Sequence, residues 1–316
     1  MPGVEIPIEK WTGKIREVKL GGGKRKELVL GGENTLPFLS FEGSIPHQPR
    51  VAIEIQDKEP TGWSPSLLSA WGDAVKDPAH WAKKAVEYGA EAISLRLVSA
   101  HPEMGNTGAA EAKKTVDKVL SAVDLPLIVI GPGVAEKDNA VLVAVSEAAK
   151  GQRIAIGNCE EKNYRTVAAV CISDGHVAIA KSPLDINLAK QLNILLTDIG
   201  VPADSILMDL DTGALGYGLE YALSIRERVR LAALGGDAMV NMPVISHSGV
   251  EAWRQKESKA SQGIPPAWGA VEERGMMWEE LTAITVMNAG SNLITLLHPK
   301  SVERIKASIH KLMGKK

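Results

Sequence analysis

The sequence predicts an α/β protein with the TIM (β/α)8 barrel fold and an N-terminal β-hairpin extension. From residue 50 onward, eight short apolar runs rich in β-branched residues alternate with segments of helical period. Eight strand-helix pairs in a chain of 316 residues suit such a barrel. An open doubly wound sheet is the alternative, and it is disfavoured because no Gly-x-Gly-x-x-Gly turn follows the first run.

Residues 1–49 precede the repeat and are predicted to form an extension separate from the barrel of residues 50–316. The segments EVKL (17–20) and ELVL (27–30) flank GGGKRK, which is typical of a β-hairpin, and the KRK at 24–26 is interpreted as its solvated tip. We expect the extension to cap the barrel or to meet a partner.

The predicted strands are almost continuously apolar, as parallel strands covered on both faces are. In chain order they are VAIEI (51–55), AISLRL (92–97), LIVI (127–130), RIAI (153–156), HVAIA (176–180), SILMDL (205–210), AMVNM (238–242) and NLITLL (292–297). The stretch 243–269 after the seventh run is longer than an ordinary βα loop and is expected to be functional.

The helices between these runs have recognisable ends. Asp77 before Pro78 predicts an N-cap, and Gly89 is expected to close that helix. Helical spacing predicts the buried faces of the fifth helix (Leu188, Leu192, Leu195, Ile199) and of the last helix (Val302, Ile305, Ile309, Leu312).

Composition excludes several classes of function. Lysine and arginine total 36 against 38 aspartates and glutamates, so the chain lacks the basic character of a nucleic-acid-binding protein. Charged residues in the first twenty positions and the absence of a long apolar run argue against a signal peptide or a membrane span, so a cytoplasmic protein is expected. Two cysteines, Cys159 and Cys171, are too few to hold an iron-sulfur cluster, which would have to belong to a partner.

In TIM barrels, functional side chains lie at the C-terminal ends of the strands. Applied in chain order, this rule gives Gln56, Asp57, Ser99, His101, Gly131, Gly133, Asn158, Lys181, Asp209, Asp211, Asn241, His247 and His298. Each of them has an alternative role in satisfying loop backbone. No subset forms an evident constellation of acid, base and nucleophile.

Some pairs within this set have specific interpretations. Asp209 and Asp211 alternate at a strand end, so one should face the barrel mouth while the other orients the glycine-containing loop that follows. A Schiff-base role for Lys181 is weighed against pairing with a neighbouring acid, which is favoured. Glu54 and Arg96, in consecutive strands, are expected to form an ion pair inside the barrel.

The segment Asp174-Gly175-His176 begins like the Asp-x-His-x-x-Gly cobalamin-binding signature, but its sixth position is Ile179. An ordinary helix-to-strand turn is predicted there instead.

Several segments resemble one known family. They are MDLDTGALGYGLEY (208–221) with IRERVRLAAL after it, GPGVAEKD (131–138), GHVAI (175–179), DINLAKQLN (185–193), NMPV (241–244), EAW (251–253) and HPKSVE (298–303). The family is that of the small subunit of the corrinoid iron-sulfur protein, also called the delta subunit of acetyl-CoA decarbonylase/synthase.

The resemblance implies a TIM barrel that forms a heterodimer with a larger subunit carrying a [4Fe-4S] cluster and a cobalamin domain. The heterodimer would be a methyl carrier of the anaerobic reductive acetyl-CoA (Wood-Ljungdahl) pathway of carbon fixation. Its cobalamin would take a methyl group from methyltetrahydrofolate through a separate methyltransferase and pass it to acetyl-CoA synthase. The resemblance also implies that the corrinoid lies between the barrel mouth and the large subunit.

A corrin held without covalent bonds needs polar partners for its amides and apolar surface against its ring. On this basis the proposed cofactor-binding residues are Asn158, Asp209, Tyr217, Asn241, Met242 and Ser246, and Gly213, Gly216 and Gly218 would allow close backbone approach. The alternative is a pterin-binding methyltransferase that uses Asp209 and Asn158, and a weaker one is an aldolase-type lyase with Lys181.

Overall fold

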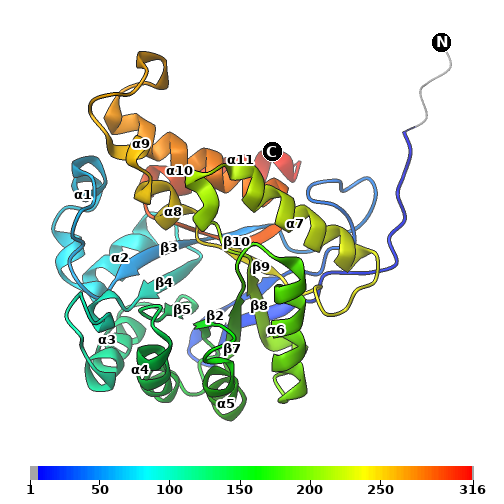
Figure 1. Ribbon diagram of the computed structural model, residues 1–316, viewed down its shortest axis with the longest axis horizontal. Helices are drawn as coiled ribbons and strands as arrows, with labels where there is room; N and C mark the ends of the chain where they lie inside the picture. The colour runs from blue at the N-terminus through cyan, green and yellow to red at the C-terminus, as the bar shows by residue number, and fades with distance from the viewer. Residues whose placement is uncertain (1–5, 315–316) are drawn as a thin grey trace.

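The computed structural model describes residues 6–314, and its centre is a closed barrel of eight parallel strands surrounded by helices (Figure 1). Each strand pairs with the next one in the chain, and the last strand pairs with the first. The predicted TIM barrel is therefore confirmed. The strands are β3 (Arg50–Gln56), β4 (Ala92–Arg96), β5 (Leu127–Ile130), β6 (Ala155–Cys159), β7 (Val177–Lys181), β8 (Ile206–Asp209), β9 (Val244–Ser246) and β10 (Ser291–Leu296).

Helices return the chain from the end of one strand to the start of the next. They are α1 (Pro65–Trp71), α2 (Pro78–Glu87), α3 (Ala109–Ala122), α4 (Ala135–Ala148), α5 (Tyr164–Asp174), α6 (Ile186–Asp198), α7 (Leu219–Leu234), α8 (Ser248–Arg254), α9 (Lys256–Lys259), α10 (Val271–Asn288) and α11 (Pro299–Leu312). Short 3-10 turns are η1 (Gly72–Lys76), η2 (Val98–Ala100), η3 (Ala203–Ser205), η4 (Gly213–Gly216) and η5 (Pro266–Trp268). Within residues 6–314, no helix combines the length and apolarity that a bilayer crossing requires.

Local signals explain where several helices begin and end. Asp77 accepts hydrogen bonds from the amides of Ala79 and His80, and Pro78 is the first residue of α2, as predicted. Gly175 has a φ of 77°, ends α5 and leads directly into β7. The Asp174-Gly175-His176 segment is therefore the ordinary turn that we predicted.

The predicted N-terminal hairpin, β1 (Val18–Gly22) and β2 (Arg25–Leu30), is present and closes the N-terminal end of the barrel (blue in Figure 1). We call residues 18–30 the plug. Its buried side chains form one cluster with residues inside the barrel, and this cluster is separate from the larger core between strands and helices. The cluster contains Val18, Leu20, Leu28, Leu30, Ala52, Ala92, Ile128, Ile130, Ala155, Val177, Ile179, Leu207, Ile245 and Leu293.

Polar contacts fix the plug to the loops that precede the strands. Gly21 donates its amide to the carbonyl of Arg153 at 3.0 Å, and Lys26 donates to that of Asp124 at 2.8 Å. Arg25 is only 7% exposed, and its guanidinium donates to the carbonyl of Leu125 at 3.3 Å. The interpretation of the KRK segment as a solvated tip is therefore wrong for Arg25. A division into separate domains at residues 49 and 50 stays a prediction, and residues 1–5 of the first range lie outside those that the structure describes.

The seventh strand differs from its predicted position. The prediction was residues 238–242, whereas β9 is Val244–Ser246. Asp237 accepts a hydrogen bond from the amide of Met239 at 3.0 Å, which holds the predicted run in a turn. Two apolar runs separated only by Pro243 compete for the strand, and the second pairs with β8 and β10.

One predicted helical face is also partly wrong. α6 buries Ala189, Leu192, Asn193 and Leu196, whereas Leu188 and Ile199 are each 42% exposed. In α11 the predicted Val302, Ile305 and Ile309 are buried, and Leu312 is exposed.

Candidate functional site

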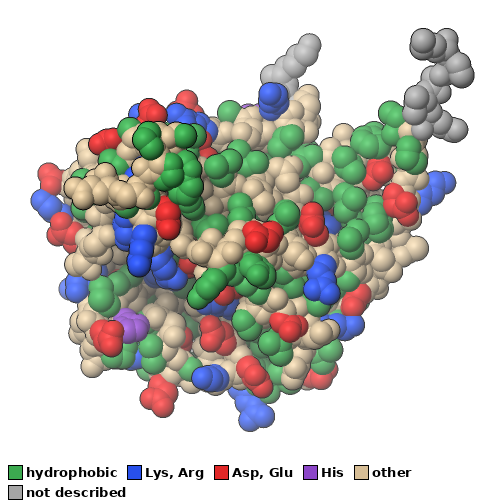
Figure 2. All heavy atoms as spheres, turned by 45° about the horizontal axis from the view of Figure 1, so that its top comes forward, with side chains coloured by type: hydrophobic (Ala, Val, Ile, Leu, Met, Phe, Trp, Pro, Cys, Tyr) green, Lys and Arg blue, Asp and Glu red, His purple; other side chains and the backbone are tan. Residues whose placement is uncertain are grey.

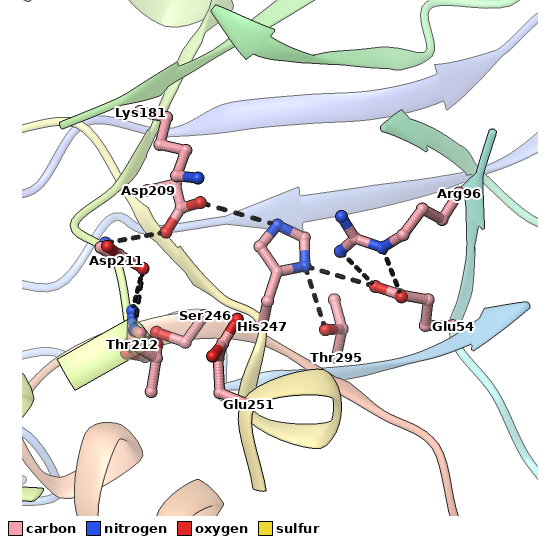
Figure 3. Close-up of polar contacts among 12 residues, drawn as sticks. Glu54, Arg96, Lys181, Asp209, Asp211, Thr212, Ser246, His247, Glu251 and Thr295 are labelled. Carbon is pink, nitrogen blue, oxygen red and sulfur yellow. Dashed lines mark hydrogen bonds and ion pairs between the residues drawn. The ribbon is translucent and has the colours of Figure 1, made fainter. Parts of the chain in front are cut away.

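The C-terminal ends of the strands form the barrel mouth, where an ion pair lies deepest. Arg96 at the end of β4 donates to both carboxylate oxygens of Glu54 in β3, at 2.7 and 2.9 Å (Figure 3). Burial acts to raise the pKa of Glu54, but the charge of Arg96 and hydrogen bonds from His247 and Arg96 outweigh it and lower that pKa to about 2. The predicted internal ion pair is confirmed, so neither of these charges is left without compensation.

His247 connects this pair to the other side of the mouth (Figure 3). Its Nδ1 lies 3.2 Å from the hydroxyl of Thr295 and 3.6 Å from a carboxylate oxygen of Glu54. Its Nε2 lies 3.8 Å from the carboxylate of Asp209, and within the described part of the chain this buried nitrogen has no hydrogen-bond partner. The imidazole is therefore held between two carboxylates, and its buried Nε2 faces Asp209.

At the end of β8 and in the loop after it, the side chains of Asp209 and Asp211 have different roles, as the alternation predicted. Asp209 is buried, and it accepts a hydrogen bond from the amide of Asp211 at 3.0 Å. Asp211 accepts from the amides of Thr212 and Gly213 at 2.7 and 2.8 Å, and its own φ is 59°. Asp209 thus faces the mouth, whereas Asp211 shapes the loop.

The loop exposes one aromatic ring between two glycines. Tyr217 is 89% exposed. Gly218 has a φ of 147°, and a Cβ there would lie 2.2 Å from the carboxylate of Glu220. A Cβ on Gly216 would meet the side chain of Gln255 at 2.9 Å. The close approach at these glycines is made by the chain's own side chains.

A buried guanidinium behind the loop was not predicted. Arg226 of α7 is 1% exposed, and within residues 6–314 no carboxylate lies at ion-pair distance from it. It donates to the hydroxyls of Ser246, Thr212 and Ser291 at 3.0, 3.0 and 3.2 Å. Burial lowers the pKa of Arg226 to about 10, opposed by Asp209 and Asp211. The sequence signal that could have indicated its burial is helical spacing. Arg226 lies four residues after Ala222 and three before Val229, and both of these are buried.

Two predicted cofactor-binding residues do not lie at the mouth, and a third is buried behind it. Ser246 ends β9, but it is fully buried and its hydroxyl is bound to Arg226. Asn241 precedes β9, and its side-chain amide donates to the carbonyl of Lys14 at 3.3 Å, at the opposite end of the barrel. Met242 is buried in the core outside the strands. The position of the seventh strand at Val244–Ser246 explains why Asn241 and Met242 lie away from the mouth.

Asn158 and Lys181 do lie at strand ends. Asn158 is buried in β6, and its carbonyl accepts a hydrogen bond from the side chain of Asn163 at 2.9 Å. Lys181 at the end of β7 lies 3.8 Å from the carboxylate of Glu160, so the favoured pairing with a neighbouring acid is present.

Other strand-end candidates support loop backbone. Asp57 after Gln56 binds the amide and hydroxyl of Ser99. His298 accepts from the amide of Lys300 at 3.2 Å and caps α11. The remaining three behave similarly: His101 accepts from the amide of Glu103, Gly131 donates to the carbonyl of Gly157, and Gly133 donates to the carboxylate of Asp138.

Two further acids near the mouth were missed. Burial raises the pKa of Glu251, which belongs to α8. Burial also raises the pKa of Glu279 in α10 to about 7, although the amides of Leu297 and His298 donate to its carboxyl group. Nothing in the local sequence distinguishes Glu279 from the exposed acids of the same helix, because its burial results from packing against α8 and β10.

The side chains at the mouth limit the ligands that it can take. Among residues 6–314, no group of three or more histidine, cysteine, aspartate or glutamate side chains could hold a metal ion. Acidic, basic and hydrophobic side chains are interspersed on the face shown in Figure 2. The ion pair of Glu54 with Arg96, the unpartnered Nε2 of His247 and the exposed ring of Tyr217 suit a neutral ligand with amide groups.

Comparison with known proteins gives one consistent family. The family model described as CO dehydrogenase/acetyl-CoA synthase delta subunit matches residues 17–300. Subunit delta of the acetyl-CoA decarbonylase/synthase complex of Archaeoglobus fulgidus is 39% identical, over 97% of this chain and 70% of that protein. Subunit delta 1 from Methanosarcina thermophila is 37% identical over 97% of this chain and 72% of that protein.

Solved structures with the same fold are more distant in sequence. A dihydropteroate synthase from Coxiella burnetii, in complex with pteroic acid, has a TM-score of 0.59 at 12% identity and covers 94% of this chain and 99% of its own. One from Xanthomonas albilineans with 4-aminobenzoic acid has a TM-score of 0.58 at 14% identity, covering 89% and 99%. At such identities the likeness concerns the fold alone.

Proposed function

The chain belongs to the CO dehydrogenase/acetyl-CoA synthase delta subunit family, and from this premise we propose that it is the small subunit of a heterodimeric corrinoid iron-sulfur methyl carrier. Its partner would be a large subunit that carries the [4Fe-4S] cluster and a cobalamin domain. The carrier would receive methyl groups from methyltetrahydrofolate through a methyltransferase and deliver them to acetyl-CoA synthase.

The observation that supports this role most directly is the internal compensation of charge at the mouth. Arg96 donates two hydrogen bonds to Glu54, and His247 lies between Glu54 and Asp209. The charges of Glu54 and Arg96 compensate each other, so a large neutral ligand can cover them without leaving either one unpaired.

The residues present fit a corrin. When bound, the corrin supplies a cobalt ion that carries the methyl group. Its peripheral amides need donors and acceptors, and the Nε2 of His247 is a buried polar atom without a partner in the described residues. We propose that Asp209, Asn158 and His247 serve these amides and that Tyr217 contacts the apolar part of the ring, while this chain contributes no catalytic residue.

The experiment is to assemble the chain with its large subunit and to measure the bound corrinoid by absorbance. The double variant Asp209→Asn/Tyr217→Ala should retain at least tenfold less corrinoid after gel filtration, because it loses a charged acceptor and an exposed aromatic contact. Phe41→Ala, which alters an exposed ring in the N-terminal extension, is the matched control. Equal corrinoid retention and equal methyl-transfer rates in all three proteins would contradict the proposed site.

A second candidate is a pterin-binding methyltransferase, which Asp209 favours because a buried carboxylate at a strand end can accept the N–H groups of a pterin. Titration of the isolated chain with methyltetrahydrofolate separates the two. Tight binding by the chain alone would favour the methyltransferase, whereas the small subunit of a carrier should bind corrinoid only with its partner.

A further inference from the structure

A cavity of about 350 Å³ opens beside the mouth, between α6 and the loops that follow β6, β7 and β8. Lys181 and Asp211 line it, and both belong to the strand ends that form the mouth. The cavity is therefore continuous with the surface on which the proposed function depends, but none of the predicted cofactor-binding residues lines it.

One wall of the cavity is apolar. Leu188, Leu192 and Leu195 recur along α6 and line the cavity together with Pro183. The sequence suggested that these leucines face the core, yet Leu188 is 42% exposed. Leu192 is buried in the core, but the exposed surface of Leu188 is available to a ligand with aliphatic groups.

Ser182, which lines the cavity, has a buried hydroxyl with no partner among the described residues. Ser182 is 3% exposed, and within the described residues its Oγ makes no hydrogen bond. Its amide donates to the carbonyl of Asp209 at 2.9 Å, so Ser182 is fixed relative to the acid that faces the mouth. Leaving a buried polar group unsatisfied is unfavourable, and a ligand with donor and acceptor atoms would satisfy it.

Charges around the cavity disfavour an anion. Three acids, Glu160, Glu161 and Asp211, line it against two lysines, Lys162 and Lys181. Glu160 lies 3.8 Å from Lys181, so part of the positive charge is already neutralised. A phosphate or carboxylate would meet a net negative surface. A neutral group with an aliphatic stem meets the leucine wall and the serine hydroxyl.

From these observations we propose that the cavity binds the neutral amide arms at one edge of the corrin, with their methylene groups on the α6 leucines and an amide on Ser182. The inference rests on the proposed function and assigns a part of the corrin to a place outside the mouth. It makes the cavity a specificity site, because arms ending in carboxylates would be rejected by its acidic lining.

The test uses the assembled heterodimer freed of corrinoid and titrated, with absorbance as the readout, with two probes. One is a corrinoid with all its amides, and the other is cobyrinic acid, in which the arms are carboxylic acids. The unsubstituted protein should bind the amide form at least tenfold more tightly. Ser182→Ala should weaken binding of the amide form about fivefold, in line with the loss of one neutral hydrogen bond.

A second variant fills the cavity without touching the core. Leu188→Trp should weaken the amide corrinoid tenfold or more, whereas Leu231→Trp, at a comparably exposed position near the end of α7, should leave its affinity unchanged. Both should unfold at the temperature of the unsubstituted protein, which shows that the tryptophans are tolerated.

The outcomes separate this inference from the proposed function. If the unsubstituted heterodimer binds no corrinoid, the proposed function itself fails. If it binds corrinoid but Ser182→Ala and Leu188→Trp bind as tightly as the control, or if cobyrinic acid binds as well as the amide form, the cavity assignment is overturned and the function stands.

Discussion

The two ends of the barrel are closed by different kinds of interaction. At the N-terminal end, Leu20 and the other apolar residues of the plug fill the space between the strands. At the C-terminal end, a chain of polar side chains that includes Arg96, Glu54, His247 and Asp209 crosses the opening. The first end is filled by the chain's own side chains, whereas the second retains a buried polar atom, the Nε2 of His247, with no hydrogen-bond partner among the described residues.

This difference indicates that the plug end of the barrel serves stability and that the mouth serves the proposed function. The plug contributes through area removed from water, which does not depend on pH. The mouth contributes through paired charges, whose value depends on pH and on both partners being present. Changes at the two ends should therefore be distinguishable by how their cost varies with conditions.

The largest effect is expected from Arg96→Met. It leaves the carboxylate of Glu54 buried without its cation, which should lower the free energy of unfolding by about 3–5 kcal/mol near neutral pH. The pKa of Glu54 is lowered to about 2 in the folded protein. The stability that this carboxylate contributes is therefore fully present above its ordinary pKa and is lost as pH falls from there toward 2. Urea unfolding at several pH values should show the cost of Arg96→Met shrinking in acid.

The control for this change is Arg304→Met, which removes a half-exposed partner of Glu280. It should cost no more than about 1 kcal/mol. Equal costs for the two arginines would mean that the charges of the mouth are no more tightly coupled than those of the surface.

The next effect belongs to the plug. Leu20→Ala removes a fully buried side chain, so unfolding should become easier by about 2–5 kcal/mol. Leu281→Ala, at an exposed position of α10, should stay within about 0.5 kcal/mol of the unsubstituted protein. The cost of Leu20→Ala should be the same in acid and at neutral pH, and a marked pH dependence would contradict the contrast between the ends.

The smallest effect concerns Glu279, which lies below the mouth and has a pKa raised to about 7 by burial. The folded protein holds this proton at pH values where the unfolded chain has released it, so stability should fall as pH rises from about 4.5 to 7, by up to about 3 kcal/mol. Glu279→Gln should flatten this slope in urea unfolding. Glu272→Gln, at an exposed position of the same helix, should leave it intact, and a slope unaffected by Glu279→Gln would assign the dependence elsewhere.

The fold was predictable because its signals are local. Alternating apolar runs and helix caps such as Asp77 lie within a few residues of the structure that they produce. The position of the seventh strand was mispredicted because the run that contains Val240 and Met242 is as apolar as Val244–Ser246. Only pairing with β8 and β10 decides which run forms the strand.

The site was predictable only in part, because its geometry depends on residues distant in sequence. The alternation at Asp209 and Asp211 assigned their two roles correctly. The position of His247 between Glu54 and Asp209 joins β3, β8 and the residue after β9, and no local pattern contains that information. The spacing of the α6 leucines correctly predicted a helix, but it did not show that Leu188 lines the cavity instead of facing the core.

The plug also has a consequence for biosynthesis. Residues 18–30 leave the ribosome before any barrel strand, yet their buried partners extend to Leu293 near the other end of the chain. The hairpin is thus synthesised before its barrel partners and can be fully seated only after Leu293 has been translated. Until then, the apolar side chains of Val18, Leu20, Leu28 and Leu30 lack part of the barrel interior that buries them in the folded protein.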